Sequence, residues 1–304
     1  MYLRYFGLTE KPFSIAPNPE FLFLSERHKE ALAHLTYGLG DAGGFVLLTG
    51  EVGTGKTTVT RSMLAQLPES TKVAFILNPS LSELELLATI CDELEIDYDS
   101  NNATLKSLTD VIKHRLLENH HSGGHTMLII DEAQHLAPEV LEQLRLLTNL
   151  ETDHKKLLQI VLVGQPELQH LLQRNELRQL AQRITARYHL LPLSESQVFA
   201  YIQYRLQKAG CQQALFHHDA VAYVHQVTAG IPRLINLLAD RCLLGAYSAS
   251  QTQVTKAIAV QAAKEALPTN LVPVASQEKS RVPLFFSVWL GMLFVAGFGL
   301  AKLV

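Results

Sequence analysis

The segment FVLLTGEVGTGKT, residues 45–57, decides the fold of this chain. Its first five residues are apolar or β-branched, as in a buried strand, and a helical pattern follows it. Residues 50–57 match the pattern G-x-x-x-x-G-K-[ST], which binds phosphate when it joins a strand to a helix. Glycine lets backbone N–H groups turn toward phosphates, Lys56 can reach the outer phosphates, and the Thr57 hydroxyl can bind Mg²⁺. The segment therefore predicts a phosphate-binding loop, or P-loop.

The residues predicted to bind the nucleotide form one continuous run. They are Gly50, Glu51, Val52, Gly53, Thr54, Gly55, Lys56, Thr57 and Thr58. An ordinary glycine-rich turn is the alternative, but the strand before the run and the helix after it argue against a plain turn.

Two acidic residues follow another short apolar run, MLII at residues 127–130. We expect Asp131 to hold Mg²⁺ together with Thr57, and Glu132 to polarise the attacking water, since phosphoryl transfer needs positioning and a base. Such a pair can also be a solvated turn, but its presence beside a P-loop indicates a catalytic site. The tetrapeptide DEAQ, residues 131–134, occurs in superfamily-two helicases. A helicase is excluded because it needs two RecA-like domains, and this chain becomes helical after Pro192.

Short apolar runs alternate with helical patterns through the first two thirds of the chain. The runs cover residues 45–49, 73–77, 127–130 and 159–163, with helices expected at 82–95 and 138–150. This alternation predicts an α/β fold whose parallel sheet is buried between helices, a three-layer αβα core. Beyond Pro192 we expect four helices, at residues 194–209, 218–229, 232–248 and 252–266. A small all-α domain therefore follows the core.

Composition limits the function classes further. The chain has 304 residues and a net charge of −3, which argues against binding nucleic acid through bulk charge. Its three cysteines, Cys91, Cys211 and Cys242, are widely separated and include no CxxC pair. This excludes a disulfide scaffold and predicts that all three are buried in a protein of a reducing compartment.

The C-terminal region contains a strongly apolar stretch. Residues 284–301 carry no charge and are preceded by Lys279 and Arg281 and followed by Lys302. They are apolar on all sides and follow a proline-containing polar linker at 268–283, so we expect a transmembrane helix rather than a buried helix of the globular domain. The basic residues before the span place the preceding chain in the cytoplasm, and no cleavable signal is expected at the N-terminus.

The P-loop, the acidic pair and the helical domain together resemble an AAA+ ATPase, and the resemblance implies further site residues. Asn78 would restrain the catalytic glutamate, and Gln165, at the end of the strand 160–164, would be sensor 1. Arg183, with Arg178 and Arg187 as neighbouring alternatives, would be the arginine finger of an adjacent subunit. Arg233, in the sequence GIPRLIN, would be sensor 2. The resemblance also implies ATP as the nucleotide and a homo-oligomer as the active form.

The N-terminal sequences YFGLTEKPF at 5–13, PNP at 17–19 and SERHKEAL at 25–32 resemble the opening of the ExeA/GspA family of secretion ATPases. The similarity runs to about residue 267, and the short chain is most similar to the form used in mannose-sensitive haemagglutinin pilus biogenesis. The expected divisions are an arm and helix at 1–40, the core at 41–193, the lid at 194–267, a linker at 268–283 and the membrane span at 284–301.

The resemblance implies an ATPase tethered to the bacterial inner membrane that hydrolyses ATP to assemble a type IV pilus or a type II-like secretion apparatus. Its partners would be assembly proteins at that membrane, and nucleic acid is not expected. The alternative is a DNA-linked AAA+ adaptor of the transposition or replication-loader kind. It would contact DNA through basic helices but has no need for the apolar span; the basic residues are Arg174, Arg178, Arg183 and Arg187. A nucleotide-gated scaffold without turnover is a third hypothesis, and the intact Glu132 argues against it.

Overall fold

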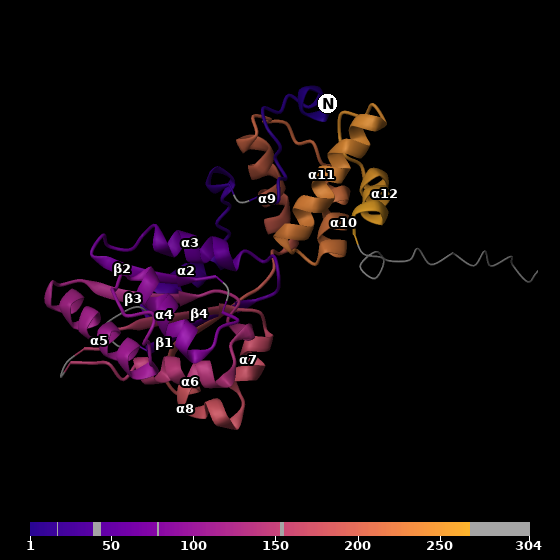
Figure 1. Ribbon diagram of the computed structural model, residues 1–304. Helices are drawn as coiled ribbons and strands as arrows, with labels where there is room; N and C mark the ends of the chain where they lie inside the picture. The colour runs from indigo at the N-terminus through magenta and orange to yellow at the C-terminus, as the bar shows by residue number, and fades with distance from the viewer. Residues whose placement is uncertain (17, 39–43, 78, 153–154, 268–304) are drawn as a thin grey trace, which may run out of the picture. The chain divides into compact units, whose positions relative to one another are not determined.

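A five-stranded parallel sheet in the order β2-β3-β4-β1-β5 forms the core of the α/β part of the computed structural model (Figure 1). The structure describes residues 1–16, 18–38, 44–77, 79–152 and 155–267. The strands are β1 (Gly44–Gly50), β2 (Thr71–Ile76), β3 (His125–Ile130), β4 (Gln159–Gly164) and β5 (Ile184–Leu190). The first four confirm the apolar runs of the sequence to within two residues at each end.

The edge strand β5 was not predicted. Its side chains alternate between half-buried and exposed, and it includes Arg187 and His189. It therefore lacks the continuous apolar run that marks a strand buried on both faces. It pairs with β1 on the side opposite β4, so the P-loop leaves a central strand of the sheet.

Helices cover both faces of the sheet, which confirms the three-layer core. Helices α2 (Glu26–Gly38) and α3 (Lys56–Leu64) pack on one face with Val46 and Leu48 of β1. Helices α4 (Glu83–Glu93), α5 (Leu105–His121) and α6 (Pro138–Leu147) pack on the other face with Phe45 and Leu47. Successive β1 side chains thus enter opposite layers, as the two-residue period of a strand requires. Two short helices, α7 (Glu167–Leu172) and α8 (Arg178–Ala181), follow β4.

Four helices follow the sheet and confirm the predicted all-α domain. They are α9 (Glu195–Lys208), α10 (His218–Thr228), α11 (Pro232–Ser248) and α12 (Lys256–Ala266). Helix α12 begins four residues later than expected, because residues 251–255 form a turn and a short bridge to Phe216. Cys91, Cys211 and Cys242 are buried and unpaired, as predicted.

The first 25 residues form an N-terminal arm that binds the helical domain. Helix α1 (Tyr2–Tyr5) contacts α11, and the Tyr2 hydroxyl donates to Asp240 Oδ1 at 2.5 Å. Further along, the Thr9 N–H donates to the Ala209 carbonyl at 2.9 Å. The arm then leads into α2, which packs against β5 and α3, so one continuous segment contacts both the helical domain and the core.

No helix of the described residues is long and apolar enough to cross a membrane. The linker predicted at 268–283 and the span predicted at 284–301 lie outside the described residues, and so does Asn78.

Candidate functional site

The P-loop needs glycine at two positions. Gly53 and Gly55 have φ angles of +83° and +105°, which L side chains rarely adopt. A Cβ at Gly53 would lie 2.6 Å from Cβ of Arg233, and one at Gly55 would lie 2.6 Å from Nε2 of His28. The loop therefore runs close beneath the start of α11 on one side and against α2 on the other.

Lys56 begins α3 and is only 6% exposed. Its Nζ donates to the carbonyl oxygens of Gly50 at 2.8 Å and Glu51 at 3.2 Å. Burial lowers the pKa of Lys56, and the nearby carboxylates of Glu132 and Asp131 oppose this shift. The ammonium group thus lies at the mouth of the loop, close to the acidic pair.

Thr57 and Asp131, the two residues predicted to hold Mg²⁺, lie in contact with each other. The Thr57 hydroxyl donates to Asp131 Oδ2 at 3.3 Å, and Asp131 is 7% exposed. The Asp131 N–H donates to the Ile76 carbonyl at 2.9 Å, which ties the end of β3 to β2. A hydroxyl and a carboxylate are the oxygen ligands that Mg²⁺ prefers, so these residues fit the ion. Bound there, Mg²⁺ would neutralise charge on the phosphate oxygens.

Two amide side chains hold the Glu132 carboxylate in place. Its Oε2 accepts from Gln134 Nε2 at 2.6 Å and from Gln165 Nε2 at 3.0 Å. Gln134 Oε1 in turn accepts from the Gln165 N–H at 3.0 Å, which closes a triangle between the end of β4 and the acidic pair. Burial raises the pKa of Glu132, but these hydrogen bonds and the charge of Lys56 outweigh it and lower the pKa overall. The carboxylate is therefore ionised at neutral pH and held in one orientation.

The contact of Gln134 with Glu132 was not predicted from the sequence. Gln134 was considered only as part of the DEAQ tetrapeptide. Its hydrogen bond to Gln165 joins residues 31 positions apart, which no local pattern indicates. Its position two residues after Glu132 was the available signal, because a turn there can direct the amide back to the carboxylate.

Replacing Gln134 with alanine should lower kcat for ATP hydrolysis by about tenfold and leave KM nearly unchanged, because it releases the base without touching the P-loop. Steady-state ATPase kinetics check this. Gln173→Ala, at an exposed glutamine that follows α7, is the matched control and should behave like wild type. An unchanged kcat in Gln134→Ala would contradict the positioning role.

Arg233, the predicted sensor 2, lies beside the P-loop. Its backbone N–H donates to the Gly53 carbonyl at 3.3 Å, and its side chain is exposed in the first turn of α11. Pro232 at the first helical position supplies the start of that turn. The structure thus brings Arg233, Lys56 and Glu132 to one cavity although they are far apart in the sequence.

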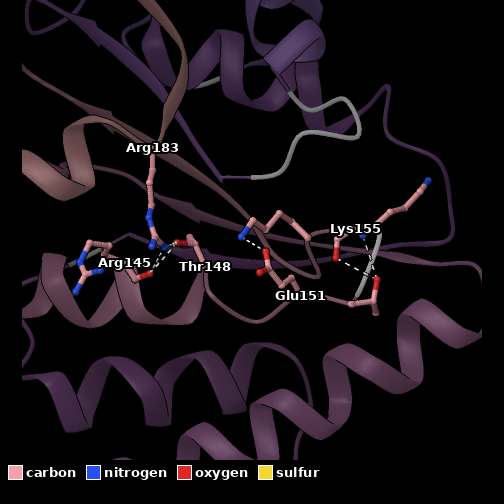
Figure 2. Close-up of polar contacts among 7 residues, drawn as sticks. Arg145, Thr148, Glu151, Lys155 and Arg183 are labelled. Atoms are coloured by element: carbon pink, nitrogen blue, oxygen red, sulfur yellow. Dashed lines mark hydrogen bonds and ion pairs between the residues drawn. The ribbon is translucent and has the colours of Figure 1, made fainter.

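Arg183, the predicted arginine finger, does not line this cavity. Its Nη1 donates to the Arg145 carbonyl at 3.0 Å and to the Thr148 hydroxyl at 2.7 Å (Figure 2). The side chain therefore caps the C-terminal end of helix α6 in the same chain. The Arg183 carbonyl accepts from Phe45 N–H, at the end of β1 opposite the P-loop. Of the two alternatives, Arg178 is exposed and Arg187 donates to the Ala181 carbonyl at 2.8 Å. None of the three lines the nucleotide cavity of its own subunit.

A cavity of about 470 Å³ joins these elements. Its walls come from the P-loop, from the first turns of α11, from α9 and from the N-terminal arm. The residues that line it include Phe21, His28, Tyr201, Arg205, Arg233 and Asn236. The volume is in the range of pockets that bind small molecules and cofactors.

His28 supports the P-loop from α2. It is 3% exposed; its Nε2 lies 3.2 Å from the Thr54 carbonyl and its Nδ1 lies 2.6 Å from the Ser25 hydroxyl. A carbonyl can only accept, so Nε2 carries the proton and the Ser25 hydroxyl donates to Nδ1. Burial lowers the pKa of His28, in keeping with a neutral ring. The sequence analysis did not identify this contact.

A P-loop on the interior strand β1, an acidic pair at the end of the parallel strand β3, which β4 separates from β1, and a helical region carrying Arg233 form the arrangement expected of an AAA domain. Residues 40–172 match the family model described as an AAA domain. The match shows an AAA domain in this part of the chain. The chain is similar to general secretion pathway protein A of Aeromonas hydrophila, with 63% identity over 248 residues, 82% of this chain. Those residues cover 45% of that protein, so the chain spans about half the length of the curated relative it matches.

Solved structures share the fold. Cdc6p from Pyrobaculum aerophilum gives a TM-score of 0.65 at 19% identity and covers 84% of this chain and 70% of its own. The RuvB Holliday junction branch migration motor of Thermotoga maritima gives 0.52 at 19% identity, with 84% and 72% covered. At these identities the likeness shows the fold alone.

Proposed function

We propose that the chain hydrolyses ATP to ADP and phosphate in this cavity to drive or regulate assembly of a secretion apparatus. The observation that carries the proposal is the 63% identity to a general secretion pathway protein over most of this chain. In the proposed site, Lys56 and the P-loop N–H groups bind the phosphates, Thr57 and Asp131 hold Mg²⁺, and Glu132 accepts a proton from the attacking water. Arg233 would reach the outer phosphate from α11, so that hydrolysis changes the contact between lid and core. Gln165 is proposed to sense the same phosphate, and Asn78 is proposed to restrain Glu132 until a ligand binds.

Type IV pilus assembly is the finer form of this proposal. The N-terminal sequences between residues 5 and 32 resemble the ExeA/GspA family of secretion ATPases. Within that family we propose an MshM-like member, which acts in mannose-sensitive haemagglutinin pilus biogenesis. The proposed partners are assembly proteins at the inner membrane.

Deletion of the gene from its native bacterium tests the cellular role. We expect the deletion to reduce secreted proteins or surface pili, and we expect wild-type protein, but not Glu132→Gln, to restore them. Which of the two outputs falls distinguishes secretion from pilus assembly. Unchanged levels of both would overturn the proposal, and ATP hydrolysis stimulated by duplex DNA would favour the DNA-linked alternative.

Membrane attachment is proposed from residues 284–301, which are uncharged and flanked by basic residues. The full chain would then sediment with membranes and resist alkaline carbonate, whereas residues 1–267, one compact unit, would remain in the supernatant and hydrolyse ATP. Release of the full chain by carbonate would contradict the tether.

An arginine supplied between subunits is proposed for the active homo-oligomer. Arg183 remains the first choice, but it would have to leave the end of α6, whereas Arg178 is already exposed on the same segment. Such a residue makes activity per subunit rise with protein concentration. Full activity of a strict monomer would remove this role.

A further inference from the structure

The side chain of Asn236 lies on the wall of the nucleotide cavity and has one hydrogen-bonding group to spare. It is 7% exposed, and its Oδ1 accepts from the Tyr201 hydroxyl at 2.8 Å. Its Nδ2 makes no hydrogen bond within the described part of the chain. In the described part of the chain, two side-chain atoms are both fully buried and without a hydrogen-bond partner, Ser62 Oγ and Glu142 Oε1. Nδ2 of Asn236 also lacks a partner but is not one of them, so it must be accessible to solvent. A nine-tenths buried amide therefore retains an open donor at the cavity.

Arg205 fixes which way this amide faces. Its Nη1 donates to the Tyr201 hydroxyl at 2.9 Å, and a guanidinium can only donate. The Tyr201 oxygen thus accepts, its own hydrogen goes to Asn236, and every group is satisfied only when Asn236 presents Oδ1 to Tyr201. Nδ2 is then left as the group that meets a ligand.

The same guanidinium fastens the N-terminal arm. Arg205 Nε donates to the Pro12 carbonyl at 2.5 Å and Nη2 to the Ser14 carbonyl at 3.2 Å. The guanidinium also lies 5.0 Å from the centre of the Phe21 ring, a cation–π contact. Arg205 is 7% exposed, so these bonds offset the cost of burying its charge. The arm and the Asn236 amide are consequently held by one buried cation.

The position of Asn236 along α11 indicates which part of a nucleotide it meets. The Arg233 N–H marks the phosphate end, because it bonds the Gly53 carbonyl of the P-loop. Asn236 lies three residues further on, about 4.5 Å along the helix axis. Beyond the P-loop the cavity is walled by the arm, including the Phe21 ring, and by Tyr201. These surroundings suit a nucleoside rather than phosphate.

We propose that Asn236 Nδ2 donates a hydrogen bond to an acceptor atom of the nucleoside part of the bound nucleotide, with Tyr201 and Arg205 as its positioning residues. The proposal rests on the proposed function in one respect, that this cavity binds ATP. It adds a contact that makes nucleotide affinity depend on the attachment of the arm.

Steady-state kinetics of the full chain test the contact. Asn236→Ala should raise KM for ATP about five- to tenfold, equivalent to the loss of about 1 kcal/mol, and leave kcat within about twofold of wild type. Inhibition by inorganic tripolyphosphate with Mg²⁺ should keep its wild-type inhibition constant, because that ligand has no nucleoside. A structural defect of the site would instead weaken the binding of both ATP and tripolyphosphate.

Two further variants complete the test. Tyr201→Phe keeps the buried ring but frees the amide, so it should raise KM about two- to threefold even if Asn236→Ala folds poorly. Leu237→Ala, at an exposed neighbour on α11 that does not line the cavity, is the matched control. An unchanged KM in both variants, or an equal loss of tripolyphosphate inhibition, would overturn the inference while leaving the ATPase proposal intact. If the wild-type protein did not bind ATP at all, the ATPase proposal itself would be overturned.

Discussion

Glu132→Gln should reduce the rate of ATP hydrolysis by about a hundredfold or more and leave ATP binding intact. The glutamine keeps the shape of the side chain and can still bond Gln134 and Gln165, but it cannot accept a proton from water. The carboxylate lies outside the phosphate-binding loop, so the affinity for ATP depends on it only weakly. Phosphate release under single-turnover conditions, together with binding of a fluorescent ATP analogue, measures both quantities.

The matched control for this variant is Glu139→Gln. Glu139 is an exposed carboxylate in the first turn of α6, seven positions from Glu132, and it does not line the cavity. The Glu139→Gln variant should hydrolyse ATP at the wild-type rate. Normal turnover by Glu132→Gln would show that another group activates the water.

Lys56→Ala should weaken ATP binding by at least about a hundredfold, because it removes a buried positive charge from the mouth of the P-loop. The fold should survive, since the ammonium group is desolvated and its partners are two loop carbonyls that water can reach once the side chain is gone. Titration with a fluorescent ATP analogue measures the loss, and the melting temperature without nucleotide checks the fold.

Lys72→Ala removes an exposed lysine from the edge strand β2 and serves as the control. Its ATP affinity should equal that of wild type. If Lys56→Ala also bound ATP normally, residues 50–57 would be only a glycine-rich turn.

The central strands and the P-loop were predictable because local sequence determines them. The runs at 45–49 and 159–163 are apolar on both faces, and only a strand covered by two helical layers buries such a run completely. Strand β5 was not predictable in this way, because half of its side chains are exposed at the edge of the sheet. The motif at 50–57 likewise requires specific residues at fixed spacing, so its chemistry can be inferred without a structure.

The parts of the site that the sequence did not predict depend on contacts between distant residues. The Arg205 bond to Pro12 joins residues 193 positions apart, and the His28 contact with Thr54 crosses from α2 to the P-loop. No periodicity or motif marks such pairs. For Arg183 the sequence predicted a role that its contacts do not indicate. Its place before β5 suggests an arginine finger, whereas its side chain caps the C-terminal end of α6 in the same chain.

The attachment of the arm has a consequence for synthesis of the protein on the ribosome. Tyr2 is made well before its partner Asp240, which lies 238 positions later in the chain. The sheet needs nothing beyond Leu190, so the core can assemble while the arm still lacks its docking helices. Closing so long a loop is a late and slow event, because the contact gives no stabilisation until both ends are present. The cavity is thus completed only after α9 and α11 have emerged, and a nascent chain with a folded P-loop cannot yet enclose the nucleotide proposed to bind there.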